Sequence, residues 1–226
     1  WTGTALRVSS SAFNLTTDGD VTASNGLFEN VRIVGGVSNN SITPFSKTEP
    51  GFIGGGSNNT INNSLNSSLI GGSNNTITDE NATSSTGSFI GGGSGNTIND
   101  GVTGEQKFAH SIIVGGVSNS IQGNIDSFIG GGSENDIRES GRRNVIVGGR
   151  FNQIFAQTSA SFVGGGELHR IIGSTDSIIG GGRSNEISAS ATSFIGGGNA
   201  NTIHSSERSS ILSGQNGNIE FSPGST

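Results

Sequence analysis

The feature that most constrains the fold of this chain is a short sequence pattern that recurs along most of its length. Each copy has two adjacent large apolar residues, two or three glycines, a short polar spacer, an asparagine, any residue and an isoleucine, as in 127–137 and 193–203. The closing isoleucines are Ile42, Ile61, Ile77, Ile98, Ile121, Ile137, Ile154, Ile171, Ile187, Ile203 and Ile219. They are separated by 16 to 23 residues, most often by 16. A near-constant period with occasional insertions is typical of a solenoid in which each repeat forms one coil.

The residue types of the pattern predict strands. Its apolar positions hold mainly β-branched and aromatic residues, and glycine makes up 40 of the 226 residues, which disfavours helix. We therefore predict an all-β fold, a β-solenoid (β-roll) of about eleven coils of 16–17 residues, over residues 31–220. Residues 1–30 lack the pattern and are expected to cap the first coil, which would otherwise expose an unpaired strand edge. Residues 221–226 are expected to form a tail or linker.

Two neighbouring apolar columns precede the glycines. The first column is Ile33, Phe52, Leu69, Phe89, Ile113, Phe128, Ile146, Phe162, Ile178, Phe194 and Ile211. The second is Val34, Ile53, Ile70, Ile90, Val114, Ile129, Val147, Val163, Ile179, Ile195 and Leu212. Because successive strand residues point to opposite faces, one column is expected to fill the coil and the other to point outward. Such a ladder exceeds the apolar patch of about 300–600 Å² found on monomers. We therefore expect the chain to associate with copies of itself and to bury this ladder along an oligomer axis, since the repeats leave no residues for a second layer within one chain.

An asparagine stands two residues before the closing isoleucine in nine of the eleven repeats, and His169 and Gly217 are the exceptions. Residues two apart share a strand face, so these asparagines can point inward and hydrogen-bond along a ladder. Alternatively, they can take a left-handed conformation at a corner of the coil. Both interpretations assign the column a structural role.

Composition excludes several classes of function. The chain has no cysteine for thiolate chemistry, and its net charge of −6 disfavours a nucleic-acid partner. No apolar run approaches the ~18 residues of a membrane span, so no membrane insertion is expected. The glycine runs lack the Lys-Ser or Lys-Thr of a phosphate loop, and the three histidines lie in different repeats. We expect no metal, no cofactor and no catalytic residues.

The segments from each isoleucine to the next apolar pair differ in length. Their minimum is six residues, but 43–51, 78–88 and 99–112 are longer. Insertions at one point of a solenoid emerge on one edge, which is often the binding edge. These linkers hold residues that the ordinary coils lack, and the candidate ligand-binding residues are Phe45, Lys47, Lys107, Phe108 and His110. An aromatic ring beside a cation suits contact with a sugar or an anionic glycan. Phe45 and Phe108 can equally fold back over the coil edge as caps.

The repeats resemble those of a known family. SFIGGG at 88–93 with NTI at 96–98 resembles the head repeats of trimeric autotransporter adhesins. That resemblance implies trimers of β-rolls with one coil per repeat, and a role in adhesion. It covers about 31–220, but the family favours a shorter period, smaller inward residues and fewer glycine triplets, and it lacks a strict Asn-x-Ile. FNLTTDGDVTASNG at 13–26 looks like segments that precede the shaft or tip of phage tail fibres.

Together these features favour a trimeric module of a phage tail fibre, a phage-like injection machine or a surface adhesin. Its expected location is therefore a virion, an injection machine or the cell surface. Its expected partners are a host-cell surface glycan or receptor and adjoining fibre or baseplate proteins. One alternative is a structural shaft that carries a binding or glycan-degrading domain elsewhere. Another is a fibre-borne glycan hydrolase or lyase, for which Asp79 with Glu80 and Glu105 with His110 are the only candidate groups.

Overall fold

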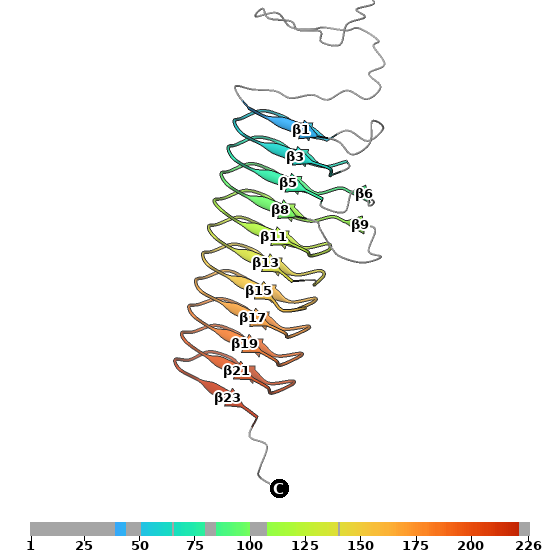
Figure 1. Cartoon of the computed structure of the whole chain (residues 1–226). Helices are drawn as coiled ribbons and strands as arrows, with labels where there is room; N and C mark the ends of the chain where they lie inside the picture. The colour runs from blue at the N-terminus through green and yellow to red at the C-terminus, as the bar shows by residue number, and fades with distance from the viewer. Residues whose placement is uncertain are drawn as a thin grey trace, which may run out of the picture.

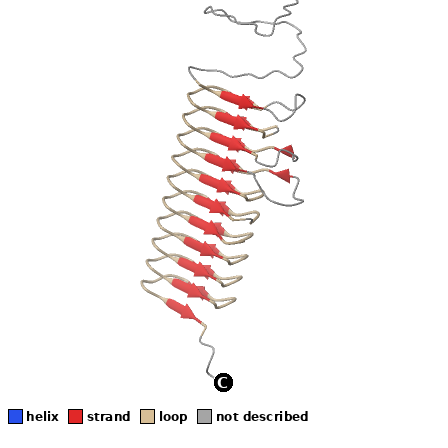
Figure 2. Ribbon diagram, viewed as in Figure 1, coloured by secondary structure: helices blue, strands red, loops and turns tan. Residues whose placement is uncertain are grey.

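A computed structural model describes residues 39–43, 51–64, 66–79, 85–99, 108–139 and 141–221. These residues contain strands and no helix, and the strands stack as the successive turns of a parallel β-solenoid (Figures 1 and 2). The turns follow each other in chain order along one axis, and most coils are 16 or 17 residues long. The predicted all-β solenoid is therefore confirmed. Residues 1–30, which are predicted to cap the first coil, lie outside the described residues. So do the predicted ligand-binding residues Phe45, Lys47 and Lys107.

The first sheet contains the closing isoleucines and has eleven parallel strands. They are β1 (Ser41–Thr43), β3 (Thr60–Asn62), β5 (Thr76–Thr78), β8 (Thr97–Asn99), β11 (Ser120–Gln122), β13 (Asp136–Arg138), β15 (Gln153–Phe155), β17 (Arg170–Ile172), β19 (Glu186–Ser188), β21 (Thr202–His204) and β23 (Asn218–Glu220). The isoleucines pair in register, as Ile121 with Ile137 and Ile187 with Ile203. Each points into the coil, and their exposed fractions are 0–2% from Ile42 to Ile203.

The second sheet contains the apolar pairs and has ten parallel strands. They are β2 (Phe52–Ile53), β4 (Ser68–Leu69), β7 (Phe89–Ile90), β10 (Ile112–Ile113), β12 (Phe128–Ile129), β14 (Val145–Ile146), β16 (Phe162–Val163), β18 (Ile178–Ile179), β20 (Phe194–Ile195) and β22 (Ser210–Ile211). The second residue of each strand points inward and packs on the isoleucines of the first sheet. A single narrow core therefore runs the length of the stack.

The register of the second sheet differs from the predicted columns. Leu69 pairs with Ile53 and Ile90, so it belongs to the inward column and not to the column of Phe52. Ile113, Ile146 and Ile211 are displaced in the same way. The inward residue stands six positions before the ladder residue in the described coils up to Ile195, as in Ile53 and Asn59. Coils with two glycines are therefore as long in this segment as coils with three. An apolar residue stands where the other coils have their first glycine.

The asparagine column forms the predicted ladder. The backbone N–H of Asn135 donates to Oδ1 of Asn119 at 3.0 Å, and Oδ1 of Asn135 accepts from the N–H of Asn152 at 3.1 Å. Nδ2 of Asn135 donates to the carbonyl oxygens of Gly131 and Gly149 at 2.9 and 3.0 Å. The left-handed conformation belongs instead to the preceding residue, as at Glu134 with φ 58°. The asparagine side chain therefore provides hydrogen-bond partners for buried backbone groups of two neighbouring coils. Such groups destabilise a fold when they have no partner.

A second buried ladder stands directly before the outward residues of the second sheet. The hydroxyl of Ser161 accepts from the N–H of Ser177 at 3.1 Å, and the hydroxyl of Ser177 accepts from the N–H of Ser193 at 3.2 Å. Asn144 takes the serine position in one coil, where its Oδ1 accepts from the N–H of Ser161 at 3.1 Å. Polar ladders at the corners and an apolar core between them thus fix the shape of every coil.

Candidate interaction surfaces

The outward side of the second sheet carries a line of apolar side chains, which we call the outer strip. It comprises Phe52, Ile70, Phe89, Ile112, Val114, Phe128, Val145, Val147, Phe162, Ile178, Phe194 and Leu212. Phe52, Phe162 and Phe194 are 36–37% exposed, and the more prominent Ile70 and Val114 are 49% and 50% exposed. The sequence therefore correctly predicts an outward apolar ladder, although its membership follows the corrected register.

Two arrangements of residues build the outer strip. Where a strand begins with phenylalanine, the ring lies over the glycine two residues later, and Cε1 of Phe128 is 3.2 Å from the place of a β-carbon on Gly130. Where a strand begins with a smaller residue, the later position is itself apolar in all coils but one, as in Val145 with Val147 and Ser68 with Ile70, whereas Gly180 follows Ile178. Each coil from β2 to β22 therefore places at least one apolar side chain on the outer strip.

The linkers in the first half of the chain form a small sheet of their own. Within 78–88 and 99–112, β6 (Ser85–Thr86) pairs in parallel with β9 (Phe108–Ala109). Figure 1 shows both strands beyond the ends of β5 and β8, at one edge of the stack. Two of the three predicted binding linkers therefore meet. The third, 43–51, is described only at its two ends.

His110 is the one predicted ligand-binding residue whose side chain is described. It is exposed, and its Nδ1 lies 3.5 Å from Oδ1 of Asp126. A β-carbon on Gly87 would lie 3.0 Å from the imidazole, so the histidine covers a glycine of the neighbouring linker. The backbone of Phe108 lies in β9. The structure thus brings His110 and Phe108 to the same linker edge.

The outer face of the first sheet changes character along the stack. From β1 to β11 it carries only hydroxyl and amide side chains, whereas from β13 onward it carries charges. Nε of Arg138 lies 3.1 Å from Oδ2 of Asp136, and Nη1 of Arg170 lies 3.2 Å from Oε2 of Glu186. The guanidinium groups of Arg138 and Arg170 each lie 5.6 Å from the centre of the Phe155 ring. These contacts join the four coils of β13, β15, β17 and β19, and each ion pair balances one acid with one base.

Two ionisable groups have pKa values that burial shifts. Burial raises the pKa of Asp136 above 3.8, and Arg138 offsets part of that effect. Burial lowers the pKa of His169 below 6.5, and backbone interactions with Gly182, Asn185 and Gly165 offset it only in part. His169 occupies an asparagine position of the ladder and is 0% exposed. His169 continues the ladder in place of an asparagine, because its N–H donates to Oδ1 of Asn152 and its Nδ1 accepts from the N–H of Asn185.

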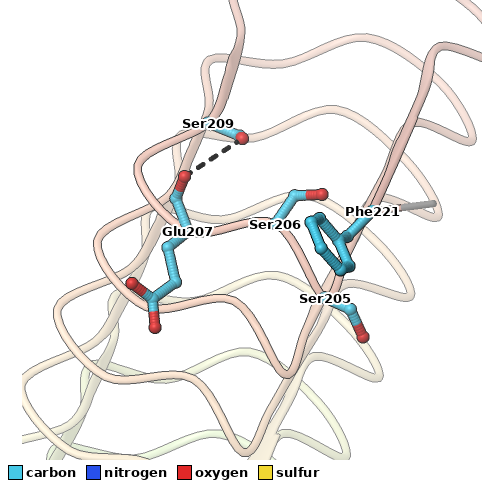
Figure 3. Close-up of a pocket in the computed structure, with 5 residues that line it drawn as sticks. All are labelled: Ser205, Ser206, Glu207, Ser209 and Phe221. Atoms are coloured by element: carbon cyan, nitrogen blue, oxygen red, sulfur yellow. Dashed lines mark hydrogen bonds between the residues drawn. The ribbon is translucent and has the colours of Figure 1, made fainter. Parts of the chain in front are cut away.

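A hollow lies at the C-terminal end of the stack, lined by Ser205, Ser206, Glu207, Ser209 and Phe221 (Figure 3). The Ser209 hydroxyl donates to the backbone carbonyl of Glu207 at 3.4 Å, and Phe221 is 62% exposed. The lining contains no histidine or lysine that could activate a serine. Sequence reasoning did not single out this hollow, since four of its residues belong to the ordinary repeat and Phe221 follows the last coil.

The described part of the chain offers little for metal or enzyme chemistry. It has no group of three or more His, Cys, Asp or Glu residues arranged to hold a metal ion. Asp79 is buried, while Glu80 and Glu105 lie outside the described residues. Within the same residues, no helix has the length and apolar character to cross a membrane. No protein-family model and no curated protein matches this chain.

Proposed function

We propose that this chain is a rigid module of an attachment fibre, from a phage tail, a phage-like injection machine or a bacterial surface, and that it assembles as a homotrimer. The observation that carries the proposal is the outer strip, an uninterrupted line of half-exposed apolar side chains along a straight stack. An apolar surface of that length is stabilised by covering it with another subunit. The resulting assembly is a stiff rod, a shape suited to holding a binding surface away from a particle or cell.

The attachment surface in this proposal is the linker edge, formed by 43–51, 78–88 and 99–112. Elsewhere the corner segments are short and follow the repeat, whereas this edge adds the β6–β9 sheet and His110. The proposed ligand is a glycan or receptor on a host cell, and the proposed neighbours are other fibre or baseplate proteins. Phe45, Lys47, Lys107 and Phe108 remain the candidate contacts, through ring stacking and charge-assisted hydrogen bonds.

The test shortens all three linkers to the six-residue minimum of the other coils and measures binding to whole cells and to a glycan panel. The proposal expects binding to be lost while the melting temperature stays within a few degrees of the parent. Retained binding would remove the linker edge from consideration. A large fall in melting temperature would show instead that the linkers are caps of the coil edge.

The second candidate is a structural shaft that carries a binding or glycan-degrading domain elsewhere. The observation that favours it is the regularity of the stack from β11 to β23, where the corners are short and the coils nearly identical. A panel on which neither the parent chain nor the shortened variant binds any glycan or cell would support the shaft.

A further inference from the structure

Three residues follow each inward residue of the second sheet before the polar spacer begins. The second of these three is glycine in every described coil except the last, and we call these glycines the middle-glycine column. They are Gly55, Gly71, Gly92, Gly115, Gly131, Gly148, Gly165, Gly181 and Gly197. A β-carbon added at Gly71 or Gly165 would meet no atom within 4 Å, and at Gly115, Gly148 or Gly181 none closer than 3.9 Å. The column therefore has open space on its outer side.

The next position along the chain is different. A β-carbon on Gly149 would overlap the carbonyl oxygen of Gly166 in the following coil, and Gly149 has φ +90°. Gly132, which precedes it in the stack, would overlap Gly149 in the same way. Packing within one chain therefore requires glycine at this later position. It does not require glycine in the middle-glycine column.

Backbone conformation explains only part of the middle-glycine column. Gly92, Gly131 and Gly165 have φ between 145° and 152°, where a side chain is strained. In Gly71, Gly115, Gly148, Gly181 and Gly197, by contrast, φ lies outside the left-handed region. These five glycines have neither a steric nor a φ requirement within their own chain.

The last coil shows that this position accepts a side chain. Ser213 follows Leu212 where the preceding coil has Gly197, and its φ is not positive. In the same coil Leu212 is 79% exposed, compared with 49% for Ile70 in the similar coil of β4. The absence of a side chain at Gly71, Gly115, Gly148, Gly181 and Gly197 therefore needs a cause outside the chain.

We propose that the outer strip and the middle-glycine column together form the face on which a second copy of this chain packs. Glycine lets another backbone approach closely, and the neighbouring apolar side chains supply the buried area. The proposal deepens the proposed function and rests on it for the expectation of a trimer. It adds the face, and it assigns the glycines to contact between chains.

The periodicity of this face identifies the occupant. Its features recur on every rung at the strand spacing of about 4.8 Å, so a matching partner must repeat at the same interval over the whole length. A second copy of the solenoid has that repeat, and closed assemblies of identical subunits are the common form of oligomer. A globular partner has no such repeat and would contact only a few rungs.

Charge and area agree with contact between copies. The outward residues of β2 to β22 are apolar or serine and none is charged, whereas the first sheet carries acids and bases from β13 onward. Covering the second sheet therefore buries no unpaired charge. Ten rungs at about 4.8 Å and a width of about 10 Å give a footprint on the order of 480 Å² per chain. Two such footprints reach about 960 Å², close to the threshold of about 1,000 Å² for a specific interface.

The test is a triple variant, Gly115→Gln, Gly148→Gln and Gly181→Gln, whose long side chains fit the free chain but block a close neighbour. Its matched control, Thr97→Gln, Ser120→Gln and Thr202→Gln, places the same side chains on the first sheet. Sedimentation equilibrium at micromolar concentration gives the mass, and circular dichroism reports the fold. We expect the control to stay oligomeric and the glycine variant to fall to the single chain of 22.8 kDa with an unchanged strand spectrum.

A milder variant covers the case in which three glutamines prevent folding. Gly148→Ala adds one methyl group that meets no atom of its own chain closer than 3.9 Å, and we expect it to weaken assembly at least tenfold without altering the spectrum. If Gly148→Ala also fails to fold, the glycines have a role within the chain and the proposal is wrong. Unchanged assembly of both glycine variants overturns the proposed face but leaves a trimer possible. A monomeric parent chain overturns the trimer as well, while glycan binding by the linker edge is measured separately.

Discussion

The backbone N–H of Asn185 donates a hydrogen bond to Nδ1 of His169 at 3.2 Å, in a ladder where the other coils use an asparagine oxygen as acceptor. On the other side, the N–H of His169 donates to Oδ1 of Asn152 at 3.0 Å. Nδ1 can accept only while it carries no proton, so the ladder holds the neutral histidine with its hydrogen on Nε2. A proton on Nδ1 would place two donors against each other.

His169 therefore makes the fold sensitive to acid. Its pKa in the folded chain is lowered, mainly by burial, from an unfolded value of 6.5, so the unfolded chain takes up a proton more readily. Its contribution to stability is complete above pH 6.5 and is lost progressively as the pH falls below that value. We expect His169→Asn to restore the asparagine ladder and to remove this loss.

The measurement is the difference in melting temperature between His169→Asn and the parent chain across the range pH 8 to pH 5. That difference should grow in favour of the asparagine variant as the solution becomes more acidic. Asp136, whose raised pKa also depends on burial, titrates equally in both chains and drops out of the comparison. A difference that is constant with pH would contradict the assignment of a neutral histidine.

Asn135 tests the ladder itself. Asn135→Ala removes an oxygen that accepts from Asn152 and an amide that donates to Gly131 and Gly149. The buried N–H of Asn152 is then left without an acceptor, which costs about 1–3 kcal/mol, whereas the Gly149 carbonyl still accepts from the N–H of Ser133. We expect a loss of about 1–3 kcal/mol in the free energy of unfolding, measured by urea titration. Asn62→Ala on the outer face of β3 should change it by less than about 0.5 kcal/mol. Equal effects of the two substitutions would argue against the ladder as a source of stability.

Gly149 and Gly173 form a matched pair of glycines with positive φ. At Gly149, a β-carbon would overlap the carbonyl oxygen of Gly166, whereas at Gly173 the nearest atom is the Ala156 oxygen at 3.7 Å. Ala156 already occupies the Gly173 corner in the previous coil, with φ 63°. We expect Gly149→Ala to cost at least about 2 kcal/mol and Gly173→Ala no more than about 1 kcal/mol. Thermal unfolding distinguishes them, and the reverse order would contradict the stacking of the glycines.

The outer strip can be tested with charge. Phe128→Asp with Phe162→Asp places two carboxylates on the surface that the proposed interface would desolvate, so we expect dissociation to a monomer or loss of the fold. Gln153→Asp with Thr202→Asp adds the same charge on the first sheet and should leave the assembly intact. Light scattering after gel filtration measures both. Dissociation of the control as well would point to general charge repulsion and not to a specific face.

The sequence predicts the core because its isoleucines recur at a nearly constant interval and only one face of a narrow coil can hold them. It does not predict the register of the second sheet, since Leu69 and Ile146 can be aligned either with the glycines that follow or with the asparagine ladder. The structure follows the alignment with the asparagine ladder. Hydrogen bonds from Asn75 and Asn152 to adjacent coils fix the number of residues between each ladder residue and the inward residue before it.

The candidate site is predicted less completely, for a physical reason. The repeated sequence determines only those parts of each coil that its hydrogen bonds and core residues hold in place. The long linkers interrupt that pattern. The pairing of Ser85 with Phe108 comes from two insertions in neighbouring coils, which sequence spacing cannot bring together. The glycines of the middle-glycine column can be read from the sequence. Only the positions of neighbouring atoms show that five of them have no steric or φ requirement within the chain.

The most direct measurement for the account as a whole is the mass of the unmodified chain in solution. Sedimentation equilibrium over a range of micromolar concentrations should give three times the 22.8 kDa of one chain, because the outer strip is otherwise left in water. The same sample should show a strand spectrum in circular dichroism. A folded chain that sediments as a single 22.8 kDa species at every concentration would contradict the fibre assembly and the proposed face together.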